Sequence, residues 1–240
     1  MNAMLATDEI LAATAHELRL PLSHIKGFVT SLRRTDVEWD DATQKEFITE
    51  IDLETDRLTE VVEALLATHT ADGRNEPDAN RGCTHPAAVV QGALHRVRGL
   101  LDGRPMQLDV SPCLPVIQMD ASQMERLLAN LIDNAVKYSP AGTAIGVSAR
   151  ITGFAELELA VEDEGPGVPL ADRERIFEPF FRMRMAEQSE VSGHGLGLAI
   201  CKSIALTHGG RIQVSERPGG GARFSVFLPA TGESVRSGDR

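Results

Sequence analysis

The sequence predicts an α+β fold: a two-helix hairpin stem followed by an α/β sandwich with a mixed, mostly antiparallel sheet. Three observations predict it: a heptad pattern near the start, one strongly amphipathic helix in the middle, and alternating apolar segments on either side of that helix. The expected boundaries are residues 4–71 for the stem, 72–84 for a polar linker, 85–231 for the sandwich and 232–240 for a flexible tail.

The stem is predicted from apolar residues spaced alternately four and three apart, which is typical of helices that pack as a bundle. In the first helix they are Leu11, Ala15, Leu18, Leu22, Ile25, Val29 and Leu32. In the second helix they are Phe47, Ile51, Leu58, Val61 and Leu65, with Asp41 as the expected N-cap. A lone hairpin of this length buries too little apolar surface, so we expect a homodimer that closes a four-helix bundle.

The sandwich is predicted from residues that alternate or recur at helical spacing. Helices are expected over residues 86–101, 121–138 and 197–207, the last ended by Gly209 and Gly210. Strands are expected over residues 106–110, 145–151, 157–161, 212–214 and 224–228, and the last two form a hairpin around residues 218–221.

Composition restricts the classes of function. A net charge of -11 argues against nucleic-acid binding, which needs a basic face. Three widely spaced cysteines fit neither a disulfide framework nor a zinc site, and this favours a reducing, cytoplasmic setting. No apolar run approaches the roughly 18 residues that cross a bilayer, so no membrane segment is expected.

The helix over residues 121–138 carries polar side chains on one face. Asn130, Asn134, Lys137 and Tyr138 follow one another at helical spacing. A side-chain amide oxygen on this face can bind Mg²⁺, which prefers hard oxygen ligands beside phosphate and water. Lys137 would then meet phosphate and Tyr138 would pack near a base. The alternative is a solvated helix face.

Asp163 continues the odd-numbered apolar positions of the strand before it, so its carboxylate is expected on the buried face. A buried carboxylate needs a partner, and the exocyclic amine of adenine is a suitable donor. Gly165 and Gly167 would let the backbone approach the ring closely. Alternatively, the strand stops at Val161 and Asp163 only starts a turn.

A second glycine-rich segment opens the helix over residues 197–207, and helix N-termini attract phosphate. Its residues are Gly193, His194, Gly195, Leu196, Gly197 and Leu198. Before it, Ile176 and Phe177 begin a phenylalanine-rich anchor that ends at Arg182, and a polar stretch with Arg184 follows as a mobile lid. The alternatives are a glycine hinge and phenylalanines that belong to the core.

His16 follows the seam position Ala15 on the flank of the first helix, with Glu17 beside it. A lone exposed histidine usually has no special role. A histidine with a neighbouring carboxylate can be a nucleophile with its base.

In this order, the motifs resemble those of the sensor histidine kinases of two-component systems. Residues 16–21 resemble the phosphoacceptor box and residues 130–138 the asparagine box. Residues 163–167, 176–182 and 193–198 resemble the first glycine, phenylalanine and second glycine boxes. A narrower resemblance, carried by residues 36–40 and 191–201, is to the kinase core of potassium-responsive and PAS-linked sensor kinases.

The resemblance implies ATP and Mg²⁺ as cofactors and a response-regulator receiver domain as partner. His16 would accept the γ-phosphoryl group, with Glu17 as its base or orienting group. Asn134 would bind Mg²⁺ and Asp163 would bind adenine. Asn130, Lys137, Arg182 and Arg184 would support the phosphates and offset their charge.

Two departures from the family matter. Leu20 stands where the family usually has threonine or serine, so the resemblance implies weak phosphatase activity towards the regulator. Only 15 residues precede His16, too few for an input domain, so we expect either a fragment of a membrane-tethered or soluble kinase or a short kinase that takes its input from a partner.

Two rival interpretations remain. The first is a degenerate kinase that binds nucleotide and a regulator without transferring phosphate. The second is another ATPase of the same superfamily, of the mismatch-repair, topoisomerase or chaperone type. The histidine-bearing stem argues against the second.

Overall fold

The computed structural model describes residues 18–69, 81–101, 103–153, 155–183 and 195–230. The chain divides into two compact units, residues 1–72 and residues 73–240. None of the helices in the described ranges is both long enough and apolar enough to cross a membrane.

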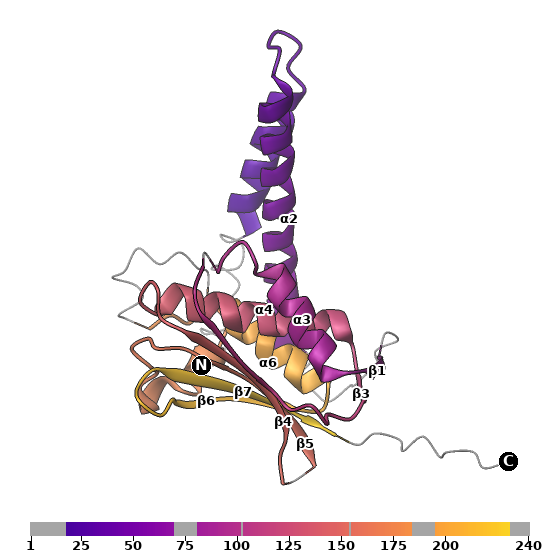
Figure 1. Cartoon of the computed structure of the whole chain (residues 1–240). Helices are drawn as coiled ribbons and strands as arrows, with labels where there is room; N and C mark the ends of the chain where they lie inside the picture. Colours follow the sequence, from indigo (N-terminus) through magenta and orange to yellow (C-terminus); the bar gives the residue numbers. More distant parts are fainter. Residues whose placement is uncertain (1–17, 70–80, 102, 154, 184–194, 231–240) are drawn as a thin grey trace, which may run out of the picture. The chain divides into compact units, whose positions relative to one another are not determined.

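The first unit is a helical hairpin (Figure 1). Residues 18–32 are helical, and α2 runs antiparallel to them over Asp41–His69. Two contacts join the helices: His24 Nδ1 lies 3.0 Å from Glu54 Oε1, and the rings of Phe28 and Phe47 have centroids 5.5 Å apart. The predicted hairpin stem is therefore confirmed over the described residues.

The N-cap of α2 is Asp40, so the prediction of Asp41 is wrong by one residue. The Thr43 N–H donates to Asp40 Oδ1 at 2.7 Å, and this bond lowers the pKa of the Asp40 carboxyl below its ordinary value. A cap has to precede the first helical residue, and Asp41 is already inside the helix.

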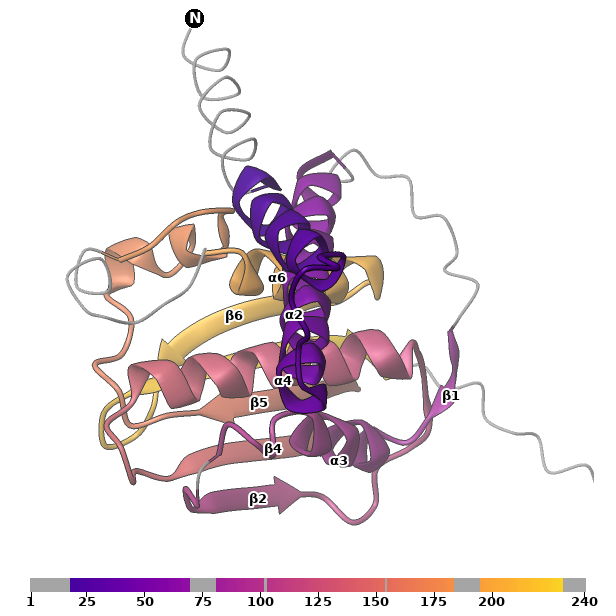
Figure 2. The same ribbon diagram turned by 90° about the horizontal axis from the view of Figure 1, so that it is seen from above.

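The second unit is a five-stranded sheet with helices on one face, as Figures 1 and 2 show. Its strand order is β2-β4-β5-β7-β6, with β2 parallel to β4 and all other neighbours antiparallel. The strands are β2 (Met106–Val110), β4 (Ile145–Ile151), β5 (Glu156–Glu162), β6 (Arg211–Glu216) and β7 (Ala222–Pro229). The predicted mixed, mostly antiparallel sheet is confirmed.

Three helices cover the sheet: α3 (Pro86–Arg96), α4 (Ala121–Tyr138) and α6 (Gly197–Thr207). The bounds of α4 and α6 agree with the prediction, and α4 buries the apolar stripe expected of it. The stripe consists of Met124, Leu127, Leu128, Leu131, Ile132 and Ala135, each at most 2% exposed.

A buried histidine joins the start of α4 to the end of α6. His208 Nε2 accepts the N–H of Asp120, the N-cap of α4, at 3.0 Å, and His208 Nδ1 lies 2.7 Å from the Ile204 carbonyl oxygen. Because a backbone N–H can only donate, the ring is neutral with its proton on Nδ1. Helices α4 and α6 are thus joined at this end.

The other face of the sheet carries charged side chains. The carboxylate of Glu158, on β5, accepts hydrogen bonds from Arg150 at 2.6 Å, from Arg223 at 2.9 Å and from Ser225 at 3.0 Å. Burial alone raises the pKa of Glu158, but these donors outweigh it and hold the pKa below its ordinary value. A polar cluster thus stabilises the three central strands, β4, β5 and β7.

Two regions differ from the prediction. Helix α3 ends at Arg96 rather than at residue 101, because Val97 leaves the helical conformation with φ -95° and ψ 5°. A small separate sheet pairs β1 (Gly82–Thr84) with β3 (Ile117–Met119). Strand β1 occupies the last three residues of the stretch predicted as a linker, on the sandwich side of the boundary between the units.

Candidate nucleotide site

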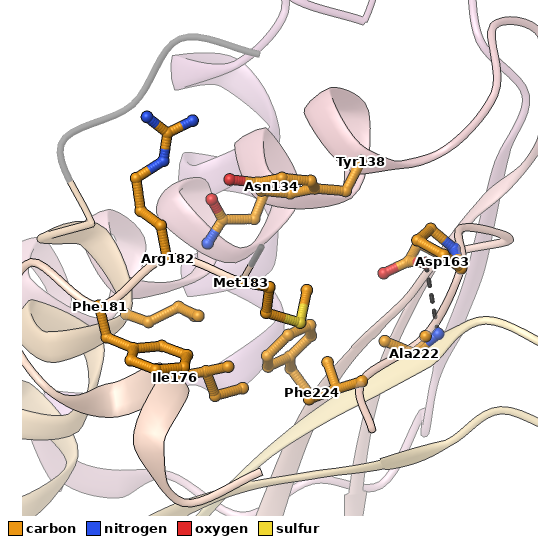
Figure 3. A pocket seen from close by; sticks show the side chains of 13 residues that line it. Asn134, Tyr138, Asp163, Ile176, Phe181, Arg182, Met183, Ala222 and Phe224 are labelled. Atoms are coloured by element: carbon orange, nitrogen blue, oxygen red, sulfur yellow. Dashed lines mark hydrogen bonds between the residues drawn. The ribbon is translucent and has the colours of Figure 1, made fainter. Parts of the chain in front are cut away.

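A pocket opens between the C-terminal half of α4, the ends of β5 and β7, and the segment before α6 (Figure 3). It has about 590 Å³ of space between its walls, including the part open to solvent. Its lining consists of Asn134, Tyr138, Asp163, Pro166, Gly167, Val168, Ile176, Phe181, Arg182, Met183, Leu198, Ala222 and Phe224.

The pocket has polar groups at its two ends and apolar side chains between them. In Figure 3 the amide of Asn134 and the guanidinium of Arg182 lie at one end, and Asp163 lies at the other. Met183 and Phe224 lie between these ends. This arrangement suits a flat apolar ring with an amine at one end and a negatively charged group at the other.

Asp163 is 5% exposed, so its predicted burial is confirmed. Burial raises the pKa of its carboxyl above the ordinary value, while the N–H groups of Gly165 and Ala222 and the charge of Arg217 offset part of the rise. Both N–H groups donate to the same oxygen, Oδ1, at 2.7 and 3.3 Å. Oδ2 therefore remains to accept from a ligand.

The loop over residues 163–167 follows β5 and leaves no room for larger residues at its glycines. A Cβ atom on Gly165 would lie 2.7 Å from the Tyr138 carbonyl oxygen at the end of α4. Gly167 has φ +71°, and its Cβ would lie 3.1 Å from the Gly221 carbonyl oxygen. Both glycines are thus required by neighbouring backbone, and their close approach to a bound ring stays a prediction.

Two residues that flank the predicted lid are joined by a hydrogen bond. The Phe180 N–H donates to the Gly195 carbonyl oxygen at 3.0 Å. Both residues have positive φ, 64° and 72°, and a Cβ on Gly195 would lie 2.9 Å from the Phe181 carbonyl oxygen. Arg175 stacks on the Phe181 ring, with its guanidinium carbon 4.5 Å from the centroid. We call the Phe180–Gly195 bond the lid tie.

The structure brings together seven of the residues predicted from sequence. The pocket is lined by Asn134, Tyr138, Asp163, Gly167, Ile176, Arg182 and Leu198. Predicted residues that are described but do not line it are Asn130, Lys137, Gly165, Phe177, Gly195, Leu196 and Gly197. His16, Glu17, Arg184, Gly193 and His194 lie outside the described residues.

Asn130 and Lys137 share α4 with Asn134 but have different surroundings. Lys137 pairs with Asp133, one turn earlier on the helix. The Asn130 Nδ2 atom is buried and has no hydrogen-bond partner within the described part of the chain. A buried donor without a partner is costly, so this amide is a group that a phosphate oxygen would satisfy. Phe177 is buried, as the core alternative for the phenylalanines expects.

The sequence interpretation missed the pocket residues Pro166, Val168, Phe181, Met183, Ala222 and Phe224. The first three lie inside or beside the predicted motifs. Ala222 and Phe224 come from β7, and only the pairing of β7 with β5 brings them to Asp163. Alternation along β7 is visible in the sequence, but it does not indicate which strand lies beside it.

The donor set fits ATP with Mg²⁺. No cluster of three or more His, Cys, Asp or Glu side chains suited to a metal ion occurs in the described ranges. Mg²⁺ commonly takes one or two protein oxygens and completes its shell with phosphate and water. The amide oxygen of Asn134, which lines the pocket, has the chemistry of such a ligand.

Two family models match the chain. Residues 6–73 match the model described as "His Kinase A (phospho-acceptor) domain". Residues 119–232 match the model described as "Histidine kinase-, DNA gyrase B-, and HSP90-like ATPase". The first match covers the stem. It argues against the second rival interpretation, an ATPase of the mismatch-repair, topoisomerase or chaperone type, because that interpretation does not account for a phosphoacceptor stem.

Individual proteins with similar sequences are also sensor histidine kinases. The sensor-like histidine kinase SenX3 of Mycobacterium tuberculosis is 32% identical over 237 residues, which cover 98% of this chain and 57% of that protein. The sensor protein KdpD of Escherichia coli is 36% identical over 224 residues, covering 92% of this chain and 24% of KdpD. The chain thus spans little more than half of the first relative and about a quarter of the second.

Among solved structures, the mycobacterial sensor histidine kinase MprB is 32% identical with a TM-score of 0.55. The similarity covers 62% of this chain and 97% of that structure.

Proposed function

The chain belongs to the two-component sensor histidine kinases, and we propose that it transfers the γ-phosphoryl group of ATP to His16 and then to an aspartate of a response regulator. The observation that carries this proposal is the pocket with Asp163 at one end and Asn134 with Arg182 at the other. The stem supplies the acceptor histidine, eight residues before His24 on the same predicted helix.

Asp163 is proposed to recognise the base. Its Oδ2 accepts a hydrogen bond from the exocyclic amine of adenine, while Gly165 and Ala222 hold Oδ1. The rings of Tyr138 and Phe224 and the side chain of Met183 exclude water from the base. A site with a buried acceptor discriminates against a base that lacks the donor, because the acceptor is then left without a partner.

The other end is proposed to hold the phosphates. Asn134 offers an amide oxygen for Mg²⁺, which neutralises phosphate charge when it is bound. Asn130 offers its buried N–H donor, and Arg182 offsets the negative charge of the loose transition state. In the chemical step an imidazole nitrogen of His16 attacks the γ-phosphorus, the bond to the leaving ADP oxygen breaks, and Glu17 takes the ring proton.

The test is to incubate the protein with Mg²⁺ and ATP that carries a radioactive γ-phosphate, and then to map the label. Acid-labile, alkali-stable label is expected on the wild type and should be lost in His16→Ala. His24→Gln is a matched control, because it changes another histidine of the same helix and should keep the label. Chelation of Mg²⁺ should abolish labelling.

A second assay distinguishes an active kinase from the rival interpretation of a degenerate kinase. A degenerate kinase binds ATP but never becomes labelled, so ATP binding without label on His16 contradicts transfer. Labelled protein should then pass the phosphoryl group to a receiver domain, whose acyl phosphate is labile to alkali. We propose that the protein acts as a dimer through its stem.

A further inference from the structure

We propose that the turn between β6 and β7 positions Asp163 for adenine, with Gly221 as the positioning residue and Arg217 as its support. The inference rests on the proposed nucleotide binding and adds a region outside the predicted motifs. It concerns residues that do not line the pocket themselves.

Gly221 lies against the backbone of Asp163. A Cβ atom on Gly221 would lie 2.0 Å from the Asp163 carbonyl oxygen and 3.1 Å from the Glu164 Cα atom. Neither neighbour is the movable end of a side chain. Any residue larger than glycine therefore has to push the backbone of Asp163 away from the turn.

Hydrogen bonds also connect the end of the turn to the carboxylate of Asp163. The Asp163 N–H donates to the Ala222 carbonyl oxygen at 3.0 Å, and the Ala222 N–H donates back to Asp163 Oδ1 at 3.3 Å. Residue 222 is thus bonded both to the backbone and to the side chain of Asp163. A shift between the turn and Asp163 disturbs the oxygen that fixes the orientation of the carboxylate.

Backbone of other elements lies close to the loop on both sides. A Cβ atom on Gly165 would lie 2.7 Å from the Tyr138 carbonyl oxygen at the end of α4, and one on Gly167 would lie 3.1 Å from the Gly221 carbonyl oxygen in the turn. The loop over residues 163–167 is therefore held between the end of α4 and the turn. Displacement by a side chain at residue 221 must move it towards α4 or along the pocket.

Arg217 fixes the turn to the same loop. Its Nη2 lies 3.1 Å from Glu164 Oε1, and its Nε lies 3.7 Å from Glu162 Oε2. The Arg217 N–H also donates to the Gly221 carbonyl oxygen at 3.2 Å. The guanidinium thus bridges the residues on either side of Asp163, and its backbone closes the turn that presents Gly221.

The chain offers a matched control within the turn. Gly220 and Gly221 have nearly the same positive φ, 98° and 104°, so alanine is strained alike at both. A Cβ on Gly220 would have nothing within 4 Å, whereas a Cβ on Gly221 meets Asp163. Comparing Gly220→Ala with Gly221→Ala separates the contact with Asp163 from the cost of the backbone conformation.

The experiment measures the dissociation constants of ATP and of inosine triphosphate, which has a carbonyl in place of the exocyclic amine. The wild type and Gly220→Ala should both prefer ATP. Gly221→Ala should lose about 10- to 100-fold in ATP affinity, as expected for one hydrogen bond to a charged group. Its preference for ATP should nearly disappear, which general weakening of the pocket would not cause.

If circular dichroism shows that Gly221→Ala does not fold, Arg217→Gln tests the positioning of Asp163 instead. It should reduce the preference for ATP while the fold persists. A preserved ATP preference in a folded Gly221→Ala, or in Arg217→Gln when the first variant is unfolded, overturns the proposal. Equal losses in Gly220→Ala and Gly221→Ala also overturn it. A wild type that binds neither nucleotide refutes the proposed function instead.

Discussion

Leu20 is 50% exposed on the first stem helix, four residues after His16. At this spacing the side chain lies one turn along the same helix face as the proposed phosphoacceptor. The family resemblance implies that a hydroxyl at this position orients the water that dephosphorylates the regulator. Leucine has no donor or acceptor, and we therefore propose that the protein is a weak phosphatase.

Leu20→Thr tests this at a single residue. The variant should speed the loss of phosphoryl from a phosphorylated regulator by up to about 100-fold, the lower end of what a positioned acid–base group contributes. The assay follows phosphorylated regulator with the protein and ADP present, and Leu20→Val is the control of similar shape to threonine. Rapid dephosphorylation by the wild type contradicts the idea.

At the residue scale, the sequence predicts features that depend on alternation along a strand or on spacing along a helix. It does not predict features that depend on which segments lie side by side in the fold. Asp163 was predicted to be buried because it continues the alternation of β5. Gly221 gave no such signal, because its constraint comes from Asp163, 58 residues away in the chain. The error between Asp40 and Asp41 has a local cause, since two adjacent aspartates offer the same capping chemistry.

At the scale of elements, the open face of the sheet depends on the Glu158 cluster. Glu158 is 4% exposed and is held by Arg150, Arg223 and Ser225. Removal of the carboxylate leaves Arg223 with only Glu162 as its acidic partner among the described residues. The cluster therefore links the stability of three strands to one ionised group.

Glu158→Gln should lower the free energy of unfolding by about 1–3 kcal/mol at neutral pH, measured by urea denaturation. The pKa of Glu158 is lower in the folded than in the unfolded state, so its contribution is complete above the unfolded value near 4.5. That contribution disappears as the pH falls through the lower folded pKa. The difference between wild type and variant should therefore shrink with acidification below pH 4.5. A constant difference contradicts the prediction.

The predictability of the elements follows their length and pattern. The bounds of helix α4 agree with the sequence prediction because its 18 residues display a sharp apolar stripe. Strands β1 and β3 have only three residues each, too few for alternation to be visible. The end of α3 was predicted too late, because residues 97–101 remain rich in apolar side chains after the helix has ended.

At the scale of the whole molecule, the stem leaves apolar side chains exposed in a single chain. Leu22 and Val29, both on the predicted heptad seam, are 54% and 38% exposed, and Ile48 and Leu53 on α2 are 59% and 47% exposed. Apolar surface arranged along helices is normally buried by another helix. This supports the proposed homodimer, in which two hairpins form a four-helix bundle.

Leu22→Glu combined with Val29→Glu should convert the protein to a monomer, because each places a charge in the proposed bundle core. Light scattering should give twice the chain mass of 25.9 kDa for the wild type and a single mass for the variant at micromolar concentration. Leu170→Glu, at an 81% exposed leucine of the short helix η2 (Leu170–Asp172), is the control and should remain dimeric. A monomeric wild type argues against the assembly.

The lid tie has a consequence for how the chain can vary. The Phe180 N–H donates to the Gly195 carbonyl oxygen, so these two residues are held together by a contact of their own. The entropy of joining two points of a chain grows only with the logarithm of the length between them, by about 0.6 kcal/mol per doubling. Insertions and deletions between these residues should therefore accumulate in evolution with little effect on the pocket. An alignment of relatives is expected to show variable length there and a retained glycine at position 195, where a side chain would strike the backbone of Phe181.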